Sequence, residues 1–333
     1  MPGCDADPAV LAWAKRYTRH PQRFESQLQA VLPRLVYVQQ VADRYDVAGE
    51  FVLLPWVESH FQPVAAHKRR PAGMWQIMPV TAGAMGLRVD GHYDGRLDVP
   101  AAANAVMKLL EQYHEQFHDW RVADYAYNAG EFRIRKMIRV HGMPAEQPAI
   151  PHWPVHKVTR EHLVKLLGMA CVVREPERFN VSLPTLPDEQ HLVQTELPHS
   201  MAITRAADHA GMSVEALRHL NPAFRNNTID ASKAPYLILP ARHARQFRDA
   251  LLEQASRRAG DDFLAGPGSG YSAADPVPGA NTAGRIHTVK RGDSLWQIAR
   301  TYSISVSQLQ RWNRLAGHTL KPGQTLTVSA PNQ

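Results

Sequence analysis

Residues 55–63 read PWVESHFQP, and residues 72–81 read AGMWQIMPVT. The first stretch holds one carboxyl residue, Glu58, which follows a seven-residue apolar run broken only by a proline. A tryptophan and a phenylalanine stand within three positions of it. Apolar surroundings disfavour the ionised form of a carboxyl group, so Glu58 is a candidate general acid near neutral pH. The alternative from these residues alone is a glutamate at a helix end that pairs with Arg or Lys at the surface.

Two further short motifs follow along the chain. Residues 93–98 read YDGRLD, and residues 126–131 read AYNAGE. The four motifs together resemble those of the lytic transglycosylases of glycoside hydrolase family 23, over a span from about residue 28 through the C-terminal end. The resemblance implies a mainly α, lysozyme-like catalytic domain of the α+β lysozyme superfamily. It also implies an enzyme that cleaves peptidoglycan and needs no cofactor and no metal.

The resemblance assigns one catalytic residue, Glu58. Its carboxyl group would protonate the glycosidic oxygen between N-acetylmuramic acid and N-acetylglucosamine, while the muramyl acetamido oxygen stabilises the anomeric carbon. The carboxylate would then take the proton of the C6 hydroxyl, and O6 would close on C1 to give a 1,6-anhydro sugar without water. Glycosidases commonly use two carboxylates, whereas this chemistry needs only one from the protein. The residues expected to bind substrate are Ser59, His67, Gln76, Tyr127, Asn128 and His162.

Three places depart from the family pattern. His67 stands where a serine is usual, Arg70 and Pro71 replace a small pair, and His162 replaces a tyrosine. We expect a neutral His67 ring to donate a hydrogen bond to the acetamido group, and the alternative is a solvated loop without a role. The departures keep two other functions open. One is a catalytically impaired protein that binds peptidoglycan, and the other is a lysozyme-type hydrolase.

Apolar residues recur at helical spacing over most of the first 180 residues, and alternating strand patterns are scarce before residue 190. Asp98 is expected to cap the helix that follows it, and Glu131 is expected to begin another. Asp94, Arg96 and Asp98 are expected to form a charge network that fixes the preceding loop. Trp75 packs either in the core or against a sugar face. The predicted helices cover 28–45, 101–117, 121–127, 132–140 and 158–173.

An internal repeat marks the C-terminal half of the chain. Residues 202–221 match residues 294–313 without gaps at a shift of 92, with identical residues at five of the key positions. Each copy is followed by an apolar, strand-like stretch, at 236–239 and at 325–328. A strand, two helices and a second strand form a compact βααβ unit, so two such units are predicted.

The second copy resembles a LysM domain over its whole length. Residues 286–299 read IHTVKRGDSLWQIA, and residues 320–326 read LKPGQTL. LysM modules bind glycans built on N-acetylglucosamine, which implies a glycan contact here; the alternative is a small folding module without a ligand. The first copy lacks the Gly-Asp turn and is interpreted as a degenerate LysM-like unit, either a glycan binder or a structural spacer. The expected glycan contacts are Gly292, Asp293, Ser294, Leu295 and Asn313.

Charge and motifs limit the choice of partner. The 333 residues carry 38 Lys and Arg against 31 Asp and Glu, a formal net charge of +7, and residues 285–330 alone hold seven Lys and Arg against one Asp. A basic unit suits the carboxylates of peptidoglycan, and nucleic acid is the competing partner, but no recognition motif accompanies the patch. No Walker-type loop and no HExxH motif is present, so nucleotide hydrolysis and zinc proteolysis have no support. We expect a monomer that binds peptidoglycan glycan strands and no nucleic acid.

Two cysteines, Cys4 and Cys171, are too few for a disulfide scaffold or a tetrahedral zinc site. Cys171 is expected to be a small core residue. Cys4 is expected to be a free cysteine on a frayed terminus, with a lipid anchor at the Gly-Cys step as the alternative. No uninterrupted apolar run of about 18 residues occurs, so no transmembrane helix is expected. The expected location is the bacterial cell envelope, on its periplasmic side.

The predicted domain organisation has five parts. The linker assignment depends on six glycines and three prolines among its residues. The parts are an N-terminal segment (1–27), a lysozyme-like transglycosylase domain (28–182), a degenerate LysM-like unit (190–245), a flexible linker (257–284) and a LysM domain (285–330).

Overall fold

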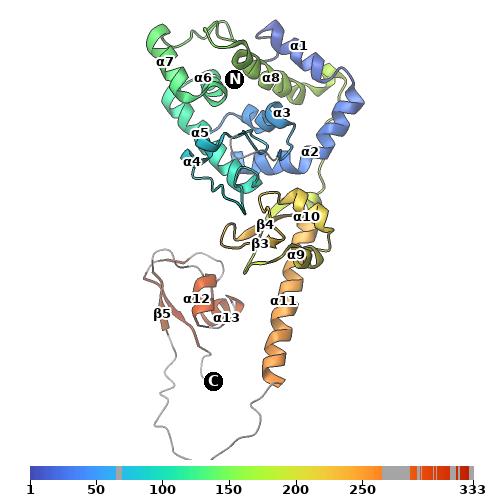
Figure 1. Cartoon of the computed structure of the whole chain (residues 1–333), viewed down its shortest axis with the longest axis vertical. Coiled ribbons are helices and arrows are strands. Elements are labelled where there is room, and N and C mark those ends of the chain that lie inside the picture. Colours follow the sequence, from blue (N-terminus) through green and yellow to red (C-terminus); the bar gives the residue numbers. More distant parts are fainter. Residues whose placement is uncertain are drawn as a thin grey trace, which may run out of the picture. The chain divides into compact units, whose positions relative to one another are not determined.

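A computed structural model of the chain describes residues 1–64, 70–264, 286–290, 293, 295–302, 304, 306–315, 320–321 and 323–329. The chain divides into two units, Met1–Gly266 and Pro267–Gln333. Helices dominate the first unit up to its LysM-like part (Figure 1). The predicted mainly α fold is therefore confirmed.

The helices of the first 190 residues begin at signals that the sequence carries. Asp98 Oδ1 accepts a hydrogen bond from the Ala101 amide at 2.8 Å, and α7 begins at Glu131, so both predicted starts are confirmed. The predicted helical stretches are all present. The elements are α1 (Pro8–Tyr17), α2 (Pro21–Ala42), η1 (Gly49–Leu53), α3 (Leu54–Ser59), α4 (Pro79–Ala84), α5 (Val99–Phe117), α6 (Trp120–Ala129), α7 (Glu131–His141), α8 (Lys157–Arg174), η2 (Pro176–Phe179) and η3 (Asp188–Gln190).

Helix α8 is the central element of this part. It packs against α1, α3 and α6, and α6 in turn packs against α5 and α7. Its residues are apolar on most sides, which is typical of a buried helix. Gly168 lets α1 approach closely, because a Cβ atom there would lie 2.9 Å from Trp13 Cβ. The side chains that α8 carries toward α3 and α6 are thus held by packing on several faces.

Residues before position 28, the predicted start of the catalytic domain, also contribute to the core of this part. Val10, Ala14 and Phe24 are buried in the same core as α8. The short helix α1 opens at Pro8, and α2 opens at Pro21, because proline is well suited to the first turn of a helix. The residues assigned to an N-terminal segment therefore belong to the catalytic fold.

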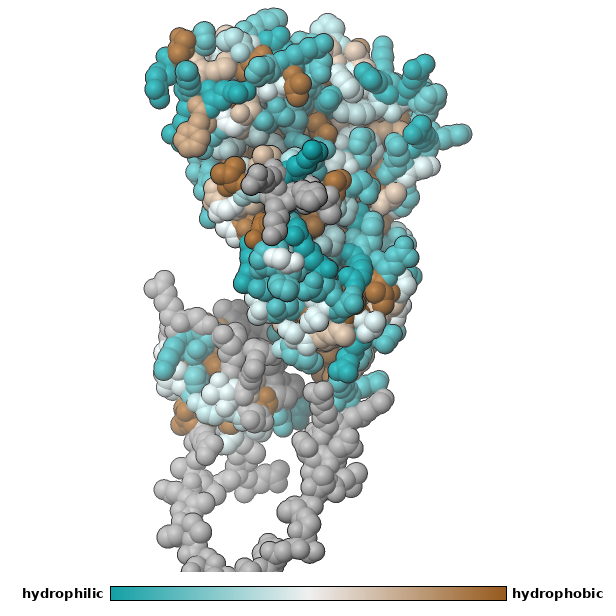
Figure 2. Space-filling view, viewed as in Figure 1, coloured by the Kyte–Doolittle hydropathy of each residue, from teal (hydrophilic) through white to brown (hydrophobic). Residues whose placement is uncertain are grey.

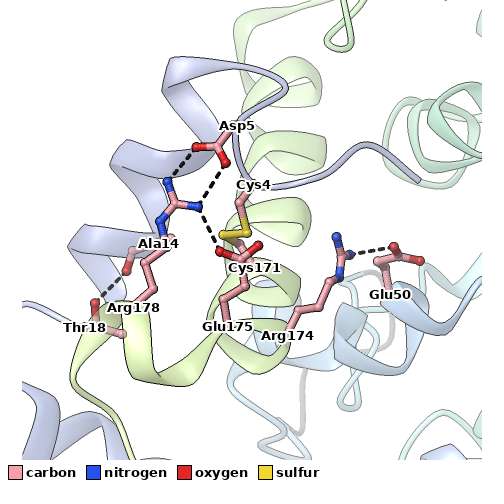
Figure 3. The surroundings of a disulfide bond; sticks show 9 residues. All are labelled: Cys4, Asp5, Ala14, Thr18, Glu50, Cys171, Arg174, Glu175 and Arg178. Carbon is pink, nitrogen blue, oxygen red and sulfur yellow. Dashed lines mark hydrogen bonds and ion pairs between the residues drawn. A yellow bond between two sulfur atoms is a disulfide. The ribbon is translucent and has the colours of Figure 1, made fainter.

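Cys4 and Cys171 form a disulfide bond, with their Cα atoms 5.3 Å apart (Figure 3). The prediction of a free Cys4 on a frayed terminus is wrong, whereas Cys171 lies in the core as predicted and forms the bond there. The reason is that α1 lies along α8, which brings together two residues that are 167 positions apart. Both cysteines are buried, and Asp5 adds an ion pair to Arg178 beside them.

The first repeat has the predicted βααβ arrangement. Strands β1 and β4 pair antiparallel from Leu192 opposite Pro240 to Glu196 opposite Tyr236, and β2 pairs with β3. The amide of Asn221 donates to Ile238 O and accepts from Ile238 N, so it fastens the end of α10 to β4. The elements are β1 (Leu192–Glu196), β2 (Met201–Ala202), α9 (Ile203–Ala210), α10 (Val214–Leu220), β3 (Thr228–Ile229), β4 (Tyr236–Pro240) and α11 (Ala241–Leu264).

Helix α11 corrects the predicted linker. The linker was expected from residue 257, but α11 extends to Leu264. Its sequence is rich in Ala, Arg and Leu, which favour helix, and a window average that includes the later glycines hides this preference. The predicted linker is therefore wrong in its first residues, and residues 265–284 lie outside the described part of the chain.

The second unit repeats the βααβ order on a smaller scale. It contains β5 (Ile286–Thr288), α12 (Leu295–Thr301), α13 (Val306–Trp312) and β6 (Thr325–Thr327), and β5 pairs antiparallel with β6. The side-chain amide of Asn313 donates to Thr327 O and accepts from Thr327 N, so it joins α13 to β6 as Asn221 joins α10 to β4 in the first repeat. The matching asparagines are thus structural clamps between a helix and a strand.

The surface in view is mostly teal and white, with brown residues in isolated places (Figure 2). The exposed large apolar side chains are spread over several helices, for example Val80 on α4, Phe132 on α7 and Leu252 on α11. Among the helices of the described residues, none combines the length and the apolar character that crossing a membrane requires.

Candidate active site

Glu58 is placed by a short buried helix. Its element, α3, follows η1, and Pro55 stands in the first turn of α3 while Trp56 fills the core. The chain then turns through two residues with positive φ, His60 at 54° and Phe61 at 57°. The Glu58 side chain lies near the end of α3 and is 16% exposed. It therefore combines an apolar setting with access from outside.

A histidine links Glu58 to a second carboxyl group. His162 Nε2 lies 3.0 Å from Glu58 Oε1, and His162 Nδ1 lies 2.9 Å from Asp124 Oδ1. The three residues come from α3, α8 and α6. Asp124 is fully buried, and His162 is 5% exposed. The site is thus a chain of three titratable groups that runs from the interior to a partly exposed carboxyl.

Burial and neighbouring charges shift the pKa values of Asp124 and His162 in opposite directions. Burial raises the pKa of Asp124, and the contact with His162 partly offsets this. Burial disfavours the charged ring of His162, but Asp124 and Glu58 more than compensate and raise its pKa to about 10. Asp124 Oδ1 lies within hydrogen-bond distance of Nδ1, so an ionised Asp124 would stabilise a charged imidazole.

Three predicted site residues fix the loop that faces Glu58. Ser59 Oγ donates to Met74 O at 2.8 Å, and Tyr127 Oη donates to Trp75 O at 2.6 Å. Gln76 Nε2 donates to Gly73 O at 2.9 Å within the same loop. The structure thus brings Ser59, Gln76 and Tyr127 to one loop beside the acid, and their contact with substrate stays a prediction.

Buried charged side chains also bind the backbone of this loop. Arg96 Nη1 donates to Arg70 O at 2.8 Å and to Ile77 O at 3.3 Å, and its guanidinium pairs with Asp94. Burial opposes ionisation of Asp94, but Arg96 and Arg225 together keep its pKa below the ordinary value. Of the predicted network, the pair of Asp94 and Arg96 is present and fixes the backbone at both ends of the 70–77 segment. Asp98 is not part of it, because its carboxylate accepts from Tyr93, Tyr236 and the Ala101 amide.

Gly73 is a position where no side chain fits. Its φ is +78°, and a Cβ atom there would lie 1.8 Å from Arg96 O. Met74 and Trp75 are buried, with 2% and 1% exposed, so the choice left open for Trp75 is settled in favour of the core. The loop therefore presents backbone carbonyl groups, and not the Trp75 ring, to the neighbouring side chains.

The remaining predicted residues are Asn128, His162 and those that lie outside the described part of the chain. Asn128 is half-buried on α6, and its role stays a prediction. His67 lies outside the described residues, as do Gly292 and Ser294 of the LysM unit. His162 does not stand free at the surface; it lies behind Glu58 and contacts it. Its predicted contact with substrate has not been tested.

Asp124 was missed in the sequence. It lies in the apolar stretch 122–126, one helical turn before Asn128, and a carboxyl in such a run signals a buried partner. The partner itself, His162, is 38 residues away.

The LysM unit shows what its predicted residues do within the fold. Asp293 Oδ2 accepts from the Lys290 amide at 2.8 Å and lies 2.8 Å from His287 Nε2. Leu295 is buried in the small core, and Asn313 is the clamp described above. Glycan contact by these three residues stays a prediction.

The chain matches three protein-family models along its length. Residues 37–150 match the Transglycosylase SLT domain. Residues 191–256 match the lytic transglycosylase MltD, LysM-like domain, and residues 287–329 match the LysM domain. The class that the fold and the site define is therefore a lysozyme-like transglycosylase with LysM-type units.

Individual relatives agree with this class. The chain is 31% identical over 329 residues to membrane-bound lytic murein transglycosylase D of Escherichia coli (strain K12), covering 98% of this chain and 70% of that protein. It is 41% identical over 99 residues to peptidoglycan transglycosylase gp16 of Escherichia phage T7, covering 29% of this chain and 8% of that protein. The chain belongs to the family of membrane-bound lytic murein transglycosylase D. The predicted family, fold and enzyme class, a lytic transglycosylase, are confirmed.

Proposed function

We propose that the enzyme cleaves the β-1,4 bond between N-acetylmuramic acid and N-acetylglucosamine of peptidoglycan and leaves 1,6-anhydro ends. One observation supports a single-carboxylate mechanism. Glu58 is partly exposed, whereas Asp124, the carboxyl tied to it through His162, is fully buried. A hydrolase with two carboxylates needs both at the scissile bond, and Asp124 cannot reach a substrate. We infer that the substrate supplies the second function.

The chemistry follows from this asymmetry. Glu58 donates its proton to the glycosidic oxygen as the C1–O bond breaks, and the acetamido oxygen of the muramyl residue stabilises the positive anomeric carbon. The Glu58 carboxylate then accepts the proton of the C6 hydroxyl, and O6 bonds to C1. The carboxyl ends the cycle protonated, so no water is consumed. General acid and base steps of this kind contribute about 10²–10⁴-fold each.

The LysM unit is proposed to hold the enzyme on glycan strands in the cell envelope, on the periplasmic side. The disulfide supports this location, because disulfides persist in oxidising compartments such as the periplasm. A lipid anchor at Cys4 is not proposed, because its sulfur is bonded to Cys171.

Mass analysis of the fragments released from purified peptidoglycan tests the function. We expect fragments with 1,6-anhydro ends from the natural sequence, and none from Glu58→Gln, which keeps the shape of the side chain but has no acidic proton. Reducing ends would identify a hydrolase. Binding without release by the natural sequence would identify a catalytically impaired peptidoglycan-binding protein.

A further inference from the structure

His162 is a buried histidine whose two ring nitrogens both face carboxyl oxygens. Its side chain is 6% exposed, between Asp124 at 0% and Glu58 at 16%. Asp124 Oδ2 is buried and has no hydrogen-bond partner among the described residues, so the Oδ1 contact with His162 is the one that balances its charge. A histidine held between two carboxyl groups has a defined ring orientation.

We propose that His162, as an imidazolium held by Asp124, is the positioning residue of Glu58: its Nε2–H occupies Oε1 and leaves Oε2 to carry the proton that reaches the substrate. The inference extends the proposed function, because it takes Glu58 as the acid and base. It concerns a position where the family pattern has a tyrosine, so it gives this departure a role.

The proposed protonation state assigns a donor role to each ring nitrogen. An ionised Asp124 requires a proton on Nδ1, and donation to Oε1 requires a second proton on Nε2. If the ring were neutral with its proton on Nδ1, Nε2 would accept and would draw the proton of Glu58 onto Oε1. That oxygen faces the interior, so the proton would be withheld from a substrate. The doubly protonated ring is the state that keeps Oε2 as the acidic oxygen.

The groups around the ring favour the charged state. Helix α6 contributes Asp124 and Tyr127, and α3 contributes Glu58. The Tyr127 ring lies 6.4 Å from the imidazole, and burial raises its pKa well above the ordinary value, so it stays neutral. Glu50 of η1 pairs with Arg174, at the other end of α8. The disulfide from Cys171 to Cys4, next to α1, is also at that end. Two carboxyl groups and no cation therefore face His162 among the described residues.

The imidazolium keeps both protons through the reaction. When Oε2 gives its proton to the glycosidic oxygen, the new carboxylate lies against the Nε2–H donor, which stabilises it. When Oε2 accepts the proton of the C6 hydroxyl, the Oε1 contact is unchanged. The cation thus strengthens the acid and weakens the base, and a neutral group in its place does the opposite.

The pH dependence of the rate tests this role. Cleavage needs a protonated Glu58, so the alkaline limb of the pH–rate profile reports on the group that contacts Oε1. Replacing His162 by Gln keeps a donor and removes the charge, so the alkaline limb of kcat/KM should move up by about one to two pH units. His162→Leu removes the donor as well, and kcat should fall further than in His162→Gln.

Asp124→Asn provides the second variant. It leaves His162 in place but removes the charge that keeps it protonated, so the alkaline limb should move in the same direction and kcat should drop. The double variant Asp124→Asn/His162→Gln should move the limb no further than either single change, because both act through one cation. Glu161→Gln is the matched control, since this neighbour on α8 is half-buried and pairs with the exposed Lys157. Unmoved alkaline limbs in folded variants would overturn the proposal and leave a merely structural histidine.

A spectroscopic readout separates the proposal from the function. Nitrogen-15 NMR of the ring at about pH 8, above the ordinary histidine pKa, should show two N–H groups on His162 in the natural sequence and a neutral ring in Asp124→Asn. A neutral His162 at that pH in the natural sequence would overturn the proposal even if the enzyme is active. Reducing ends in the product analysis would instead refute transglycosylation, while leaving the positioning of Glu58 to be decided by the NMR result.

Discussion

The disulfide between Cys4 and Cys171 should contribute strongly to stability. The two cysteines are 167 residues apart, and closing a loop of that length in the unfolded chain corresponds to about 5 kcal/mol in the chain-entropy relation. Measured contributions are commonly smaller, so we expect Cys4→Ala/Cys171→Ala to lower the free energy of unfolding by about 3–5 kcal/mol. For a unit of this size the melting temperature should fall by roughly 10 °C. Alanine is chosen because both sites are buried, where a serine hydroxyl would lack a partner.

The fold itself should survive the loss of the bond. Helix α1 packs along α8 at the close approach that Gly168 permits, and Asp5 pairs with Arg178 beside the disulfide (Figure 3). We therefore expect the circular dichroism spectrum to be unchanged at low temperature. The amides of α1 should exchange faster, because this helix lies next to the broken link.

Thermal unfolding with and without a reductant is the assay. Reductant should lower the melting temperature of the natural sequence to that of the double variant and leave the variant unchanged. Asp5→Asn is the control, since it alters the same segment through an exposed ion pair and should shift the melting temperature little. If the double variant melts at the temperature of the natural sequence, the stabilising role of the disulfide is refuted.

Three further perturbations test the loop, its support and the glycan anchor. Gly73→Ala should destabilise the fold by about 3 kcal/mol or more and abolish cleavage, because its Cβ would lie 1.8 Å from a backbone oxygen. Gly83→Ala has open space around its Cβ and should melt as the natural sequence does, so equal melting of the two variants would contradict this reasoning. Arg225→Gln should lower stability by about 1–3 kcal/mol and reduce kcat/KM, because it removes one of the two cations that face the buried carboxylate of Asp94; unchanged melting and kinetics would show that the pair is dispensable. Removing residues 285–333 should weaken pelleting with insoluble peptidoglycan, most clearly at low salt, and leave cleavage of short soluble glycans intact; equal retention of both proteins would exclude the LysM unit as the anchor.

The helices were predictable where local residues define them. An aspartate followed two residues later by Pro100 marks the start of α5 in any context, and the apolar spacing after it defines the buried face. The disulfide was not predictable, because nothing local to Cys4 or to Cys171 specifies that α1 lies along α8. The extent of the core was underestimated for the same reason, since a short helix such as α1 becomes recognisable only through what it packs against.

The site shows the same division between local and distant information. Glu58 was identified from its apolar neighbours and from its motif, and both are properties of adjacent residues. The link through His162 depends on the packing of α8 against α3 and α6, so it required the structure. The sequence indicated that His162 departs from the family pattern, but the effect of the departure depends on Asp124, a residue outside the four motifs.

The first LysM-like unit makes contacts with the catalytic part of the chain. Its Arg225 pairs with Asp94, and its Tyr236 hydroxyl donates to Asp98 at 2.9 Å, so its polar groups are directed at the loop that leads to α5. Three residues of the catalytic part share its hydrophobic core, namely Ala72, Tyr93 and Leu97. These contacts give the unit a structural role beside the catalytic loop. We infer that this copy acts as a support for the loop around Gly73, and that glycan affinity lies with the second copy, where the Lys and Arg residues are concentrated.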